Sequence, residues 1–253
     1  MRRYGLLGKS LQHSYSQALF AQKFAQENIV DASYSLFELS DLTNWDAWSQ
    51  AQLRHPEGAL QGLNVTVPYK QAILAHLDRL TPEAQAIGAV NALRPLGDGL
   101  WMGHNTDAQG FAKSIRPFLT SHHERALILG NGGAAAAVRY VLESLGIEVV
   151  HVTRQHTDSV RAVRFEDLTE EAVRFFGLIV QATPVGTVPR VEEVLPFPWS
   201  GLGTEHLVID LIYNPSETRF LQRAAQQGAT VLNGKDMLFN QAQAAWDWWN
   251  QAD

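Results

Sequence analysis

The sequence predicts an α/β fold divided into two domains. Along the chain, apolar runs of strand length alternate with segments whose apolar residues recur at helical spacing. This alternation is typical of strands joined by helices. A polar connection, Arg116 to Arg125, separates two series of such elements. The 253 residues are enough for two hydrophobic cores.

The most informative stretch is a glycine-rich turn in the second half. Ala126 to Leu129 form an apolar run, Gly130 to Ala135 fit G-x-G-x-x-A, and a helical pattern follows from Ala134 to Leu145. Ile147 to Val152 then read as a second buried strand. Glycine lets the backbone turn sharply and lets a diphosphate approach the N–H groups at the helix start. This order of elements predicts a dinucleotide-binding βαβ unit of the Rossmann type.

The residues after the second strand bear on the choice of cofactor. An NAD site usually has an acidic residue here for the ribose 2′-hydroxyl, whereas this chain has Thr153 and Arg154. A guanidinium suits the 2′-phosphate of NADP. Asp158 would repel that phosphate, so NADP is favoured and NAD stays possible.

Composition excludes several other classes of protein. The formal net charge of −6 argues against nucleic acid or an anionic membrane as a partner, and no apolar run is long enough to span a bilayer. The N-terminus lacks a signal-length apolar core, so we expect a cytoplasmic protein. The absence of cysteine excludes disulfides and thiolate chemistry. We expect no metal site, because His122 and His123 lie in a polar linker where histidines are usually solvated.

The first half contains the elements of an α/β domain. A polar loop precedes its first helix, in which Ser14 or Ser16 can cap the helix or bind a small carboxylate at its positive end. We expect strands at Arg3 to Leu7, Tyr34 to Glu38, Leu60 to Val67 and Ala89 to Leu93, and helices at Gln17 to Glu27 and Asp41 to Leu53.

Lys70 stands in an unusual position. Polar residues alternate along the strand from Asn64, Pro68 ends that strand, and Lys70 falls in the first turn of the next helix. The positive end of a helix dipole disfavours an ammonium, which favours a role in proton transfer. A solvated surface lysine is the alternative.

After a hairpin turn at Gly97 to Gly99, one of Asn105, Thr106 or Asp107 is expected to cap a helix from Ala108 to Leu119.

Beyond Arg154 the expected order is helices, strand, loop, strand, helix, strand and helix. The loop Thr183 to Gly186, at the end of a strand, is expected to line the nicotinamide site. The helices are Thr157 to Arg164, Thr169 to Phe175, Glu217 to Gln227 and one opened by Gly234, and the strands are Leu178 to Ala182, His206 to Leu211 and Ala229 to Leu232.

With these segments located, the chain resembles the shikimate dehydrogenase family along nearly its whole length. The resemblance is carried by a series of motifs in the family's order, of which the NVTVPYK, GAVNA and NTD segments are the most specific. The motifs are HSYS (His13 to Ser16), NVTVPYK (Asn64 to Lys70), GAVNA (Gly88 to Ala92), NTD (Asn105 to Asp107), GNGGAA (Gly130 to Ala135), ATPVG (Ala182 to Gly186), YNPSETRFL (Tyr213 to Leu221) and the region of Gln241.

The resemblance implies an enzyme that reversibly reduces 3-dehydroshikimate to shikimate with NADPH, in aromatic amino acid biosynthesis. It implies a substrate domain at about 1–104 that the last helix, about 236–253, rejoins, and a Rossmann domain at 105–235. Lys70 would be the acid/base, with Asp107 beside it. The substrate would be bound by Ser14, Ser16, Asn64, Thr66, Asn91, Tyr213 and Gln241. The cofactor would be bound by Gly130, Asn131, Gly132, Gly133 and Ala134 at the diphosphate, Thr153 and Arg154 at the adenosine end, and Leu211 and Gly234 near the nicotinamide.

Three departures from the family pattern leave alternatives open. A second arginine often found near the position of Asp158 is absent, Thr187 replaces the methionine after the ATPxG motif, and Gln181 replaces the asparagine before it. One alternative is an NAD-dependent quinate/shikimate dehydrogenase. Another is a non-catalytic sensor of shikimate-like metabolites, which would be expected to lose Lys70 and Asp107. The partner is expected to be a small molecule, and the protein a monomer or homodimer.

Overall fold

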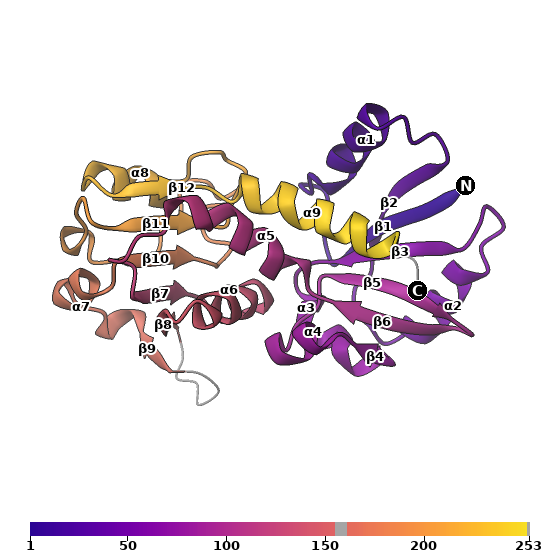
Figure 1. The fold of residues 1–253 in the computed structure, drawn as a ribbon, viewed down its shortest axis with the longest axis horizontal. Coiled ribbons are helices and arrows are strands. Elements are labelled where there is room, and N and C mark those ends of the chain that lie inside the picture. The colour runs from indigo at the N-terminus through magenta and orange to yellow at the C-terminus, as the bar shows by residue number, and fades with distance from the viewer. Residues whose placement is uncertain (155–160, 252–253) are drawn as a thin grey trace. The chain divides into compact units, whose positions relative to one another are not determined.

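The computed structural model describes residues 1–154 and 161–251, and it divides into two compact units. Unit 1 comprises Met1–Gln109 and Gln241–Asp253, and unit 2 comprises Gly110–Asn240. Each unit is built on one six-stranded sheet with helices against it, which confirms the α/β class (Figure 1). None of the described helices is long and apolar enough to cross a membrane. Asp158 lies outside the described residues.

The sheet of unit 1 has the strand order β2-β1-β3-β5-β6-β4. Strand β1 pairs in parallel with both β2 and β3, whereas β5 and β6 form an antiparallel hairpin. In the hairpin turn Gly97, Asp98 and Gly99 all have positive φ, a conformation that glycine and aspartate tolerate. The strands are β1 (Arg2–Gly8), β2 (Ala32–Glu38), β3 (Leu60–Val65), β4 (Arg79–Leu80), β5 (Ala92–Gly97) and β6 (Leu100–His104).

Two apolar layers cover the two faces of this sheet. On one face Leu7, Leu63 and Val65 join Trp45 and Trp101 in a buried cluster. The other face carries aromatic rings from α1 and from the C-terminal part of α9. The helices are α1 (Ser16–Gln26), α2 (Trp45–Leu53), α3 (Tyr69–Ala72), α4 (Pro82–Ile87), α9 (Lys235–Trp249) and the 3-10 helix η1 (Ile73–His76).

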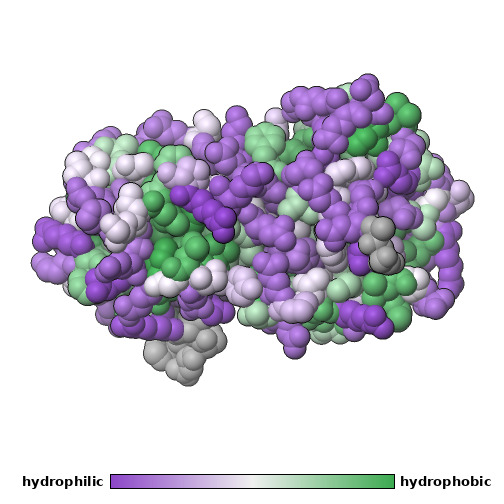
Figure 2. Space-filling model, viewed as in Figure 1, coloured by the Kyte–Doolittle hydropathy of each residue, from purple (hydrophilic) through white to green (hydrophobic). Residues whose placement is uncertain are grey.

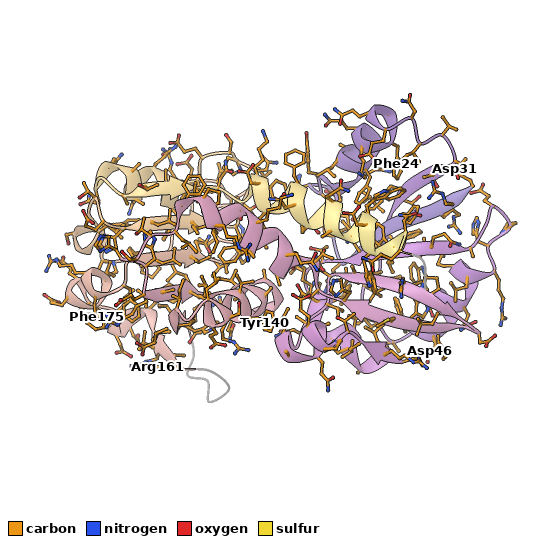
Figure 3. The ribbon with its side chains drawn as sticks, in the orientation of Figure 1. Phe24, Asp31, Asp46, Tyr140, Arg161 and Phe175 are labelled. Carbon is orange, nitrogen blue, oxygen red and sulfur yellow. The ribbon has the colours of Figure 1, made fainter. Side chains whose placement is uncertain are left out.

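The end of α9 is an integral part of unit 1. Phe24 of α1 (Figure 3) packs against Trp246, with ring centroids 5.4 Å apart. The indole Nε1 of Trp249 donates to the Leu93 carbonyl at 3.0 Å. A Cβ atom on Gly62 would lie 2.3 Å from the Trp249 ring, so the ring reaches the sheet only because that position is glycine. The tryptophans at the end of α9 are thus buried in the core of unit 1.

The sheet of unit 2 is parallel throughout, with the order β12-β11-β10-β7-β8-β9 (Figure 1). Numbered within the unit, this is the Rossmann order 3-2-1-4-5-6, which reverses between β7 and β10. Dinucleotides bind at that reversal in such sheets. The strands are β7 (Arg125–Leu129), β8 (Glu148–Thr153), β9 (Ala162–Arg164), β10 (Leu178–Gln181), β11 (Leu207–Asp210) and β12 (Thr230–Leu232).

The core of unit 2 lies between the strands and the flanking helices. Leu127, Val152, Ile179 and Val208 from four strands pack with Phe220 of α8. Figure 2 shows apolar residues gathered on the front of this unit among a largely hydrophilic surface. The helices are α5 (Thr106–Ile115), α6 (Gly133–Ser144), α7 (Glu170–Phe175) and α8 (Arg219–Gln226), with 3-10 helices η2 (Arg116–Phe118), η3 (Phe165–Asp167) and η4 (Trp199–Gly201).

Two predicted elements were wrong. The strand expected from Ala89 begins only at Ala92, because the Val90 N–H donates to the Lys70 carbonyl in α3 rather than to a neighbouring strand. Ala162–Arg164, expected to end a helix, form β9 instead and extend the parallel ladder from β8. That pairing comes from the neighbouring strand and overrides local helical spacing. The remaining elements are present, with ends displaced by a few residues.

The capping predictions had mixed outcomes. The N-cap of α1 is Tyr15, so neither serine caps that helix; the Ser14 hydroxyl oxygen accepts from the Ser16 N–H at 3.3 Å. Asn105 does cap α5, since its Oδ1 accepts from the Ala108 N–H at 3.2 Å.

Asp210, at the end of β11, holds the loop that leads to α8. Its Oδ1 accepts from the Ile212 N–H at 3.0 Å, and its Oδ2 accepts from the Thr218 hydroxyl at 2.6 Å. Thr218 in turn caps α8 by accepting from the Leu221 N–H. Burial raises the pKa of Asp210 to about 7, although both hydrogen bonds oppose that shift.

This raised pKa predicts a loss of stability as the pH rises. Between the unfolded pKa near 4 and the folded pKa of about 7, only the folded protein holds the proton, so Asp210 contributes stability at low pH that disappears toward pH 7. Asp210→Asn keeps the shape without the charge. At each pH, we compare the free energy of unfolding of Asp210→Asn with that of the parent. We expect this difference to favour the variant by about 1–3 kcal/mol more at pH 8 than at pH 5.

Urea denaturation of the nucleotide-free protein at the two pH values measures this difference. Asp46→Asn, at an exposed aspartate of α2 (Figure 3), is the matched control and should show a pH-independent difference. A constant difference between Asp210→Asn and the parent would contradict the raised pKa.

Candidate active site

The centre of the candidate site in unit 1 is an ion pair. The Lys70 ammonium donates to Asp107 Oδ2 at 2.5 Å, and the two side chains are 15% and 6% exposed. Lys70 belongs to α3 and Asp107 to the first turn of α5. The structure therefore brings together the two predicted catalytic residues. Because α3 has only four residues, its dipole is small, and the nearby carboxylate is the main electrostatic partner of Lys70.

Backbone contacts fix the position of Lys70. The Lys70 carbonyl accepts from the Val90 N–H at 2.8 Å, which ties α3 to the segment before β5. The neighbouring Tyr69 ring is buried, and its hydroxyl donates to the Leu39 carbonyl at 2.6 Å. The short helix is therefore anchored on both sides of the lysine.

Asn91 connects Asp107 to the rest of the site. Its Nδ2 donates to Asp107 Oδ1 at 2.9 Å, while its Oδ1 accepts from the Thr106 N–H at 2.7 Å. Asn91 is 3% exposed, and its Nδ2 also lies 3.2 Å from Gln241 Oε1, to which it donates. The carboxylate thus receives an amide on one oxygen and the lysine on the other.

Asn64 extends this network toward the first helix. Its Nδ2 donates to the Asn91 carbonyl at 3.0 Å, and its Oδ1 accepts from the Tyr34 hydroxyl at 2.8 Å. The Ser16 side chain lies close enough to the Tyr34 hydroxyl to oppose the rise in its pKa that burial causes. Hydrogen bonds therefore join Tyr34, through Asn64, to Asn91, and Ser16 lies beside the Tyr34 end.

The remaining predicted substrate residues occupy different places. Ser14 contacts the backbone of Ser16, and Thr66 follows Asn64 by two positions, with its N–H donating to the Leu7 carbonyl. Tyr213 belongs to unit 2, in the partly exposed loop after β11. No group of three His, Asp or Glu side chains among the described residues is arranged to hold a metal ion.

His104 supports the strand end that leads to Asp107. Its Nδ1 lies 2.9 Å from the Thr81 hydroxyl, and its ring packs on Trp248 at a centroid distance of 5.0 Å. Burial, with a smaller contribution from Arg94, lowers the pKa of His104 to about 4. The imidazole is therefore neutral near pH 7.

The glycine turn in unit 2 has room for a diphosphate. Gly130 has φ +115°, a conformation that favours glycine, and a Cβ there would touch Thr183 at 3.0 Å. A Cβ on Gly132 would meet open space, with no described atom within 4 Å. Gly132 is exposed and is the N-cap of the twelve-residue α6. The residues present fit a group that binds to backbone N–H donors at a helix N-terminus.

A buried histidine, His151, fixes the backbone of this turn. His151 Nδ1 lies 2.8 Å from the Gly130 carbonyl, and burial lowers the pKa of His151. The neutral ring donates from Nδ1 to that carbonyl. The Gly130 N–H donates to the Val152 carbonyl at 2.9 Å, so both backbone polar groups of Gly130 are fixed by β8.

The other predicted cofactor residues lie on the same unit. Thr153 is buried at the end of β8, and Arg154 after it is exposed. Gly234 contacts Leu211 so closely that a Cβ would lie 2.0 Å from the Leu211 carbonyl oxygen. Gly234 thus has a packing role, whatever else it does. The Gln181 amide donates to the Val185 carbonyl at 3.0 Å and closes the loop Thr183 to Gly186.

Sequence reasoning assigned no role to Tyr34 or His151. Strand alternation would have indicated that both are buried, but not what they contact. Asn64 stands 30 residues beyond Tyr34, and Gly130 stands 21 residues before His151. Only the packing of neighbouring strands brings these partners together.

The chain is similar to known proteins of one family. A family model described as the shikimate dehydrogenase substrate binding domain matches residues 6–93. A shikimate dehydrogenase (NADP(+)) from Bacillus cereus AH187 is 34% identical over 97% of this chain and 91% of its own length.

Solved structures are also similar. Shikimate 5-dehydrogenase from Thermus thermophilus, in complex with NADP(H) and shikimate, is 33% identical and matches 99% of this chain and 94% of that chain with a TM-score of 0.85. Quinate dehydrogenase from Corynebacterium glutamicum, in complex with NAD, is 26% identical and matches 98% and 93% of the two chains with a TM-score of 0.84. The motifs, the fold and these similarities together establish that this chain belongs to the shikimate dehydrogenase family.

Proposed function

We propose that this protein is an NADP-dependent shikimate dehydrogenase, which reversibly reduces 3-dehydroshikimate to shikimate in aromatic amino acid biosynthesis. The observation that carries the proposal is the ion pair of Lys70 and Asp107, held by Asn91, in a chain of this family. Such a pair can move a proton to and from an alcohol oxygen.

The proton step follows from the geometry of this pair. In reduction, the Lys70 ammonium gives a proton to the carbonyl oxygen of the substrate as hydride reaches the carbonyl carbon. In oxidation, the Lys70 amine takes the hydroxyl proton as hydride leaves. Asp107 orients the lysine at 2.5 Å in both directions. Because Lys70 is 15% exposed, it can exchange its proton with water between turnovers.

The polar side chains around the pair fit a polyhydroxylated acid. Asn64, Thr66, Asn91 and Gln241 offer amide and hydroxyl groups for ring hydroxyls. Ser14 and Ser16 offer hydroxyl donors for the carboxylate, and we assign Tyr213 to the same substrate. Buried amides joined by hydrogen bonds keep fixed orientations, which reduces the entropy lost on binding.

NADP, when bound, supplies or accepts the hydride. The residues Gly130 to Ala134 would hold its diphosphate, since the space at Gly132 is open and α6 directs backbone N–H groups there. Thr153 and Arg154 would bind the adenosine end, with the exposed guanidinium on the 2′-phosphate. Leu211 and Gly234 would lie near the nicotinamide.

The alternative function is an NAD-dependent quinate/shikimate dehydrogenase. The similarity to a quinate dehydrogenase with NAD favours it, as does the absence from the sequence of a second arginine near the position of Asp158. A spectrophotometric assay of shikimate and quinate, each with NADP and NAD, separates the two functions. Faster turnover of shikimate with NADP supports the first, and comparable turnover of quinate with NAD supports the second.

The intact ion pair argues against a non-catalytic sensor, which would not need a proton-transfer lysine.

We further propose a cytoplasmic location, where NADPH is available, and a monomer or homodimer as the working form.

Lys70→Ala tests the proton step directly. We expect turnover to fall on the order of a hundredfold, while the KM for shikimate stays nearly unchanged, because a general acid/base acts mainly in the transition state. Initial rates followed by NADPH absorbance measure both constants. Lys113→Ala, at an exposed lysine of α5, is the control and should retain parental turnover. Parental turnover in Lys70→Ala would remove this residue from the mechanism.

Arg154→Ala tests recognition of the 2′-phosphate. A charge-assisted hydrogen bond is worth about 1.5–3 kcal/mol, so we expect the KM for NADPH to rise about 10- to 100-fold and that for NADH to change little. Arg174→Ala, at an exposed arginine of α7, should change neither value. Equal losses with both cofactors would show that the phosphate is recognised elsewhere.

A further inference from the structure

Tyr34 is a buried tyrosine whose hydroxyl lies near two residues of the candidate site, Asn64 and Ser16. It stands on β2, is 7% exposed, and its ring stacks on Phe20 at a centroid distance of 4.3 Å and an interplanar angle of 9°. The stack fixes the plane of the ring. The hydroxyl therefore has a defined position, 2.8 Å from Asn64 Oδ1.

The hydrogen-bond directions at this hydroxyl follow from its neighbours. Asn64 donates from Nδ2 to the Asn91 carbonyl, so its Oδ1 faces Tyr34 and accepts the only Tyr34 proton. Toward the nearby Ser16 side chain, the Tyr34 oxygen then has only a lone pair to offer. Burial raises the pKa of Tyr34 well above 10, so the proton stays in place at any working pH. A hydrogen bond between these two side chains would therefore have Ser16 as its donor.

We propose that Tyr34 is a positioning residue for the substrate, because its hydroxyl fixes the Asn64 amide and lies beside the Ser16 side chain. This inference rests on the proposed function, in which Ser16 binds the carboxylate and Asn64 a ring hydroxyl. One side chain would then set the distance between the two subsites. Through Asn64 and Asn91 the same hydrogen bonds reach Asp107.

Tyr34→Phe removes one oxygen and keeps the stacking ring. We expect the KM for shikimate to rise about tenfold, the cost of leaving one buried hydrogen-bond acceptor unsatisfied, while kcat and the KM for NADP change little. A shift in one constant only is the mark of substrate positioning, since a general loss of folded protein would lower the apparent kcat.

Tyr4→Phe is the matched control. Tyr4 lies on the adjacent strand β1, is 1% exposed, stacks on Trp249, and its hydroxyl donates to Asn250 Oδ1 at 3.3 Å. It thus resembles Tyr34 in burial and stacking, but its hydroxyl donates to Asn250, which is not a predicted substrate residue. We expect its kinetic constants to stay within about twofold of the parent, and thermal melting of both variants shows whether either has lost stability.

The methyl ester of shikimate tests the route through Ser16. The ester lacks the charged carboxylate that this serine would bind, so the ratio of parental to Tyr34→Phe kcat/KM should fall from about tenfold with shikimate to under about threefold with the ester. Equal ratios for the two substrates, or the same constants in Tyr34→Phe and Tyr4→Phe, would overturn the positioning role while leaving the enzyme assignment intact. A parental protein that does not oxidise shikimate overturns the proposed function and this role with it.

Discussion

The candidate active site depends on the side chain of Asn91. Its amide nitrogen donates to Asp107 and its amide oxygen accepts from the backbone at the start of α5, so one residue fixes both the carboxylate and the helix that carries it. Asp107 in turn determines where the Lys70 ammonium lies. A buried amide can do this because each of its atoms has a partner, and leaving one unsatisfied would cost about 1–3 kcal/mol. Asn64 receives its orientation from the same segment. The positions of Asp107, Lys70 and Asn64 therefore all depend on Asn91.

Unit 2 achieves a comparable rigidity by a different means. Its turn from Gly130 to Ala135, which we propose binds the diphosphate, contains glycines that allow a tight backbone path, and neighbouring strands restrict that path. β8 supplies both the Val152 carbonyl and the His151 ring to Gly130. Gln181 closes the next loop along the same sheet edge. The glycines alone would make this turn flexible, but its contacts with neighbouring strands hold it in one conformation. A preorganised phosphate site requires such a fixed backbone.

The sequence predicted what depends on local patterns. The Gly130 to Ala135 turn, its flanking strands and its helix were recognisable because each occupies a short continuous stretch. Lys70 and Asp107 are 37 residues apart, and propensity alone favoured a surface lysine; only the resemblance of the surrounding motifs indicated that they meet. The strand β9 and the hydrogen bonds of Tyr34 and His151 could not be predicted, because each depends on a partner brought close by sheet packing. The expected capping by Ser14 or Ser16 failed because Tyr15 takes the N-cap position and Ser16 is already the first residue of α1.

The contact of Trp249 with Gly62 and Leu93 has a consequence for biosynthesis. Unit 1 is made of the first 109 residues and the last 13, so the ribosome releases its final side chains only after all of unit 2 has been made. Until then, the sheet face that Trp246 and Trp249 cover must remain open to water or to a chaperone. A nascent chain can therefore complete the Rossmann unit first, although it is encoded second. Removal of the last turn of α9, which carries Trp246, Trp248 and Trp249, would remove part of the core of the N-terminal unit.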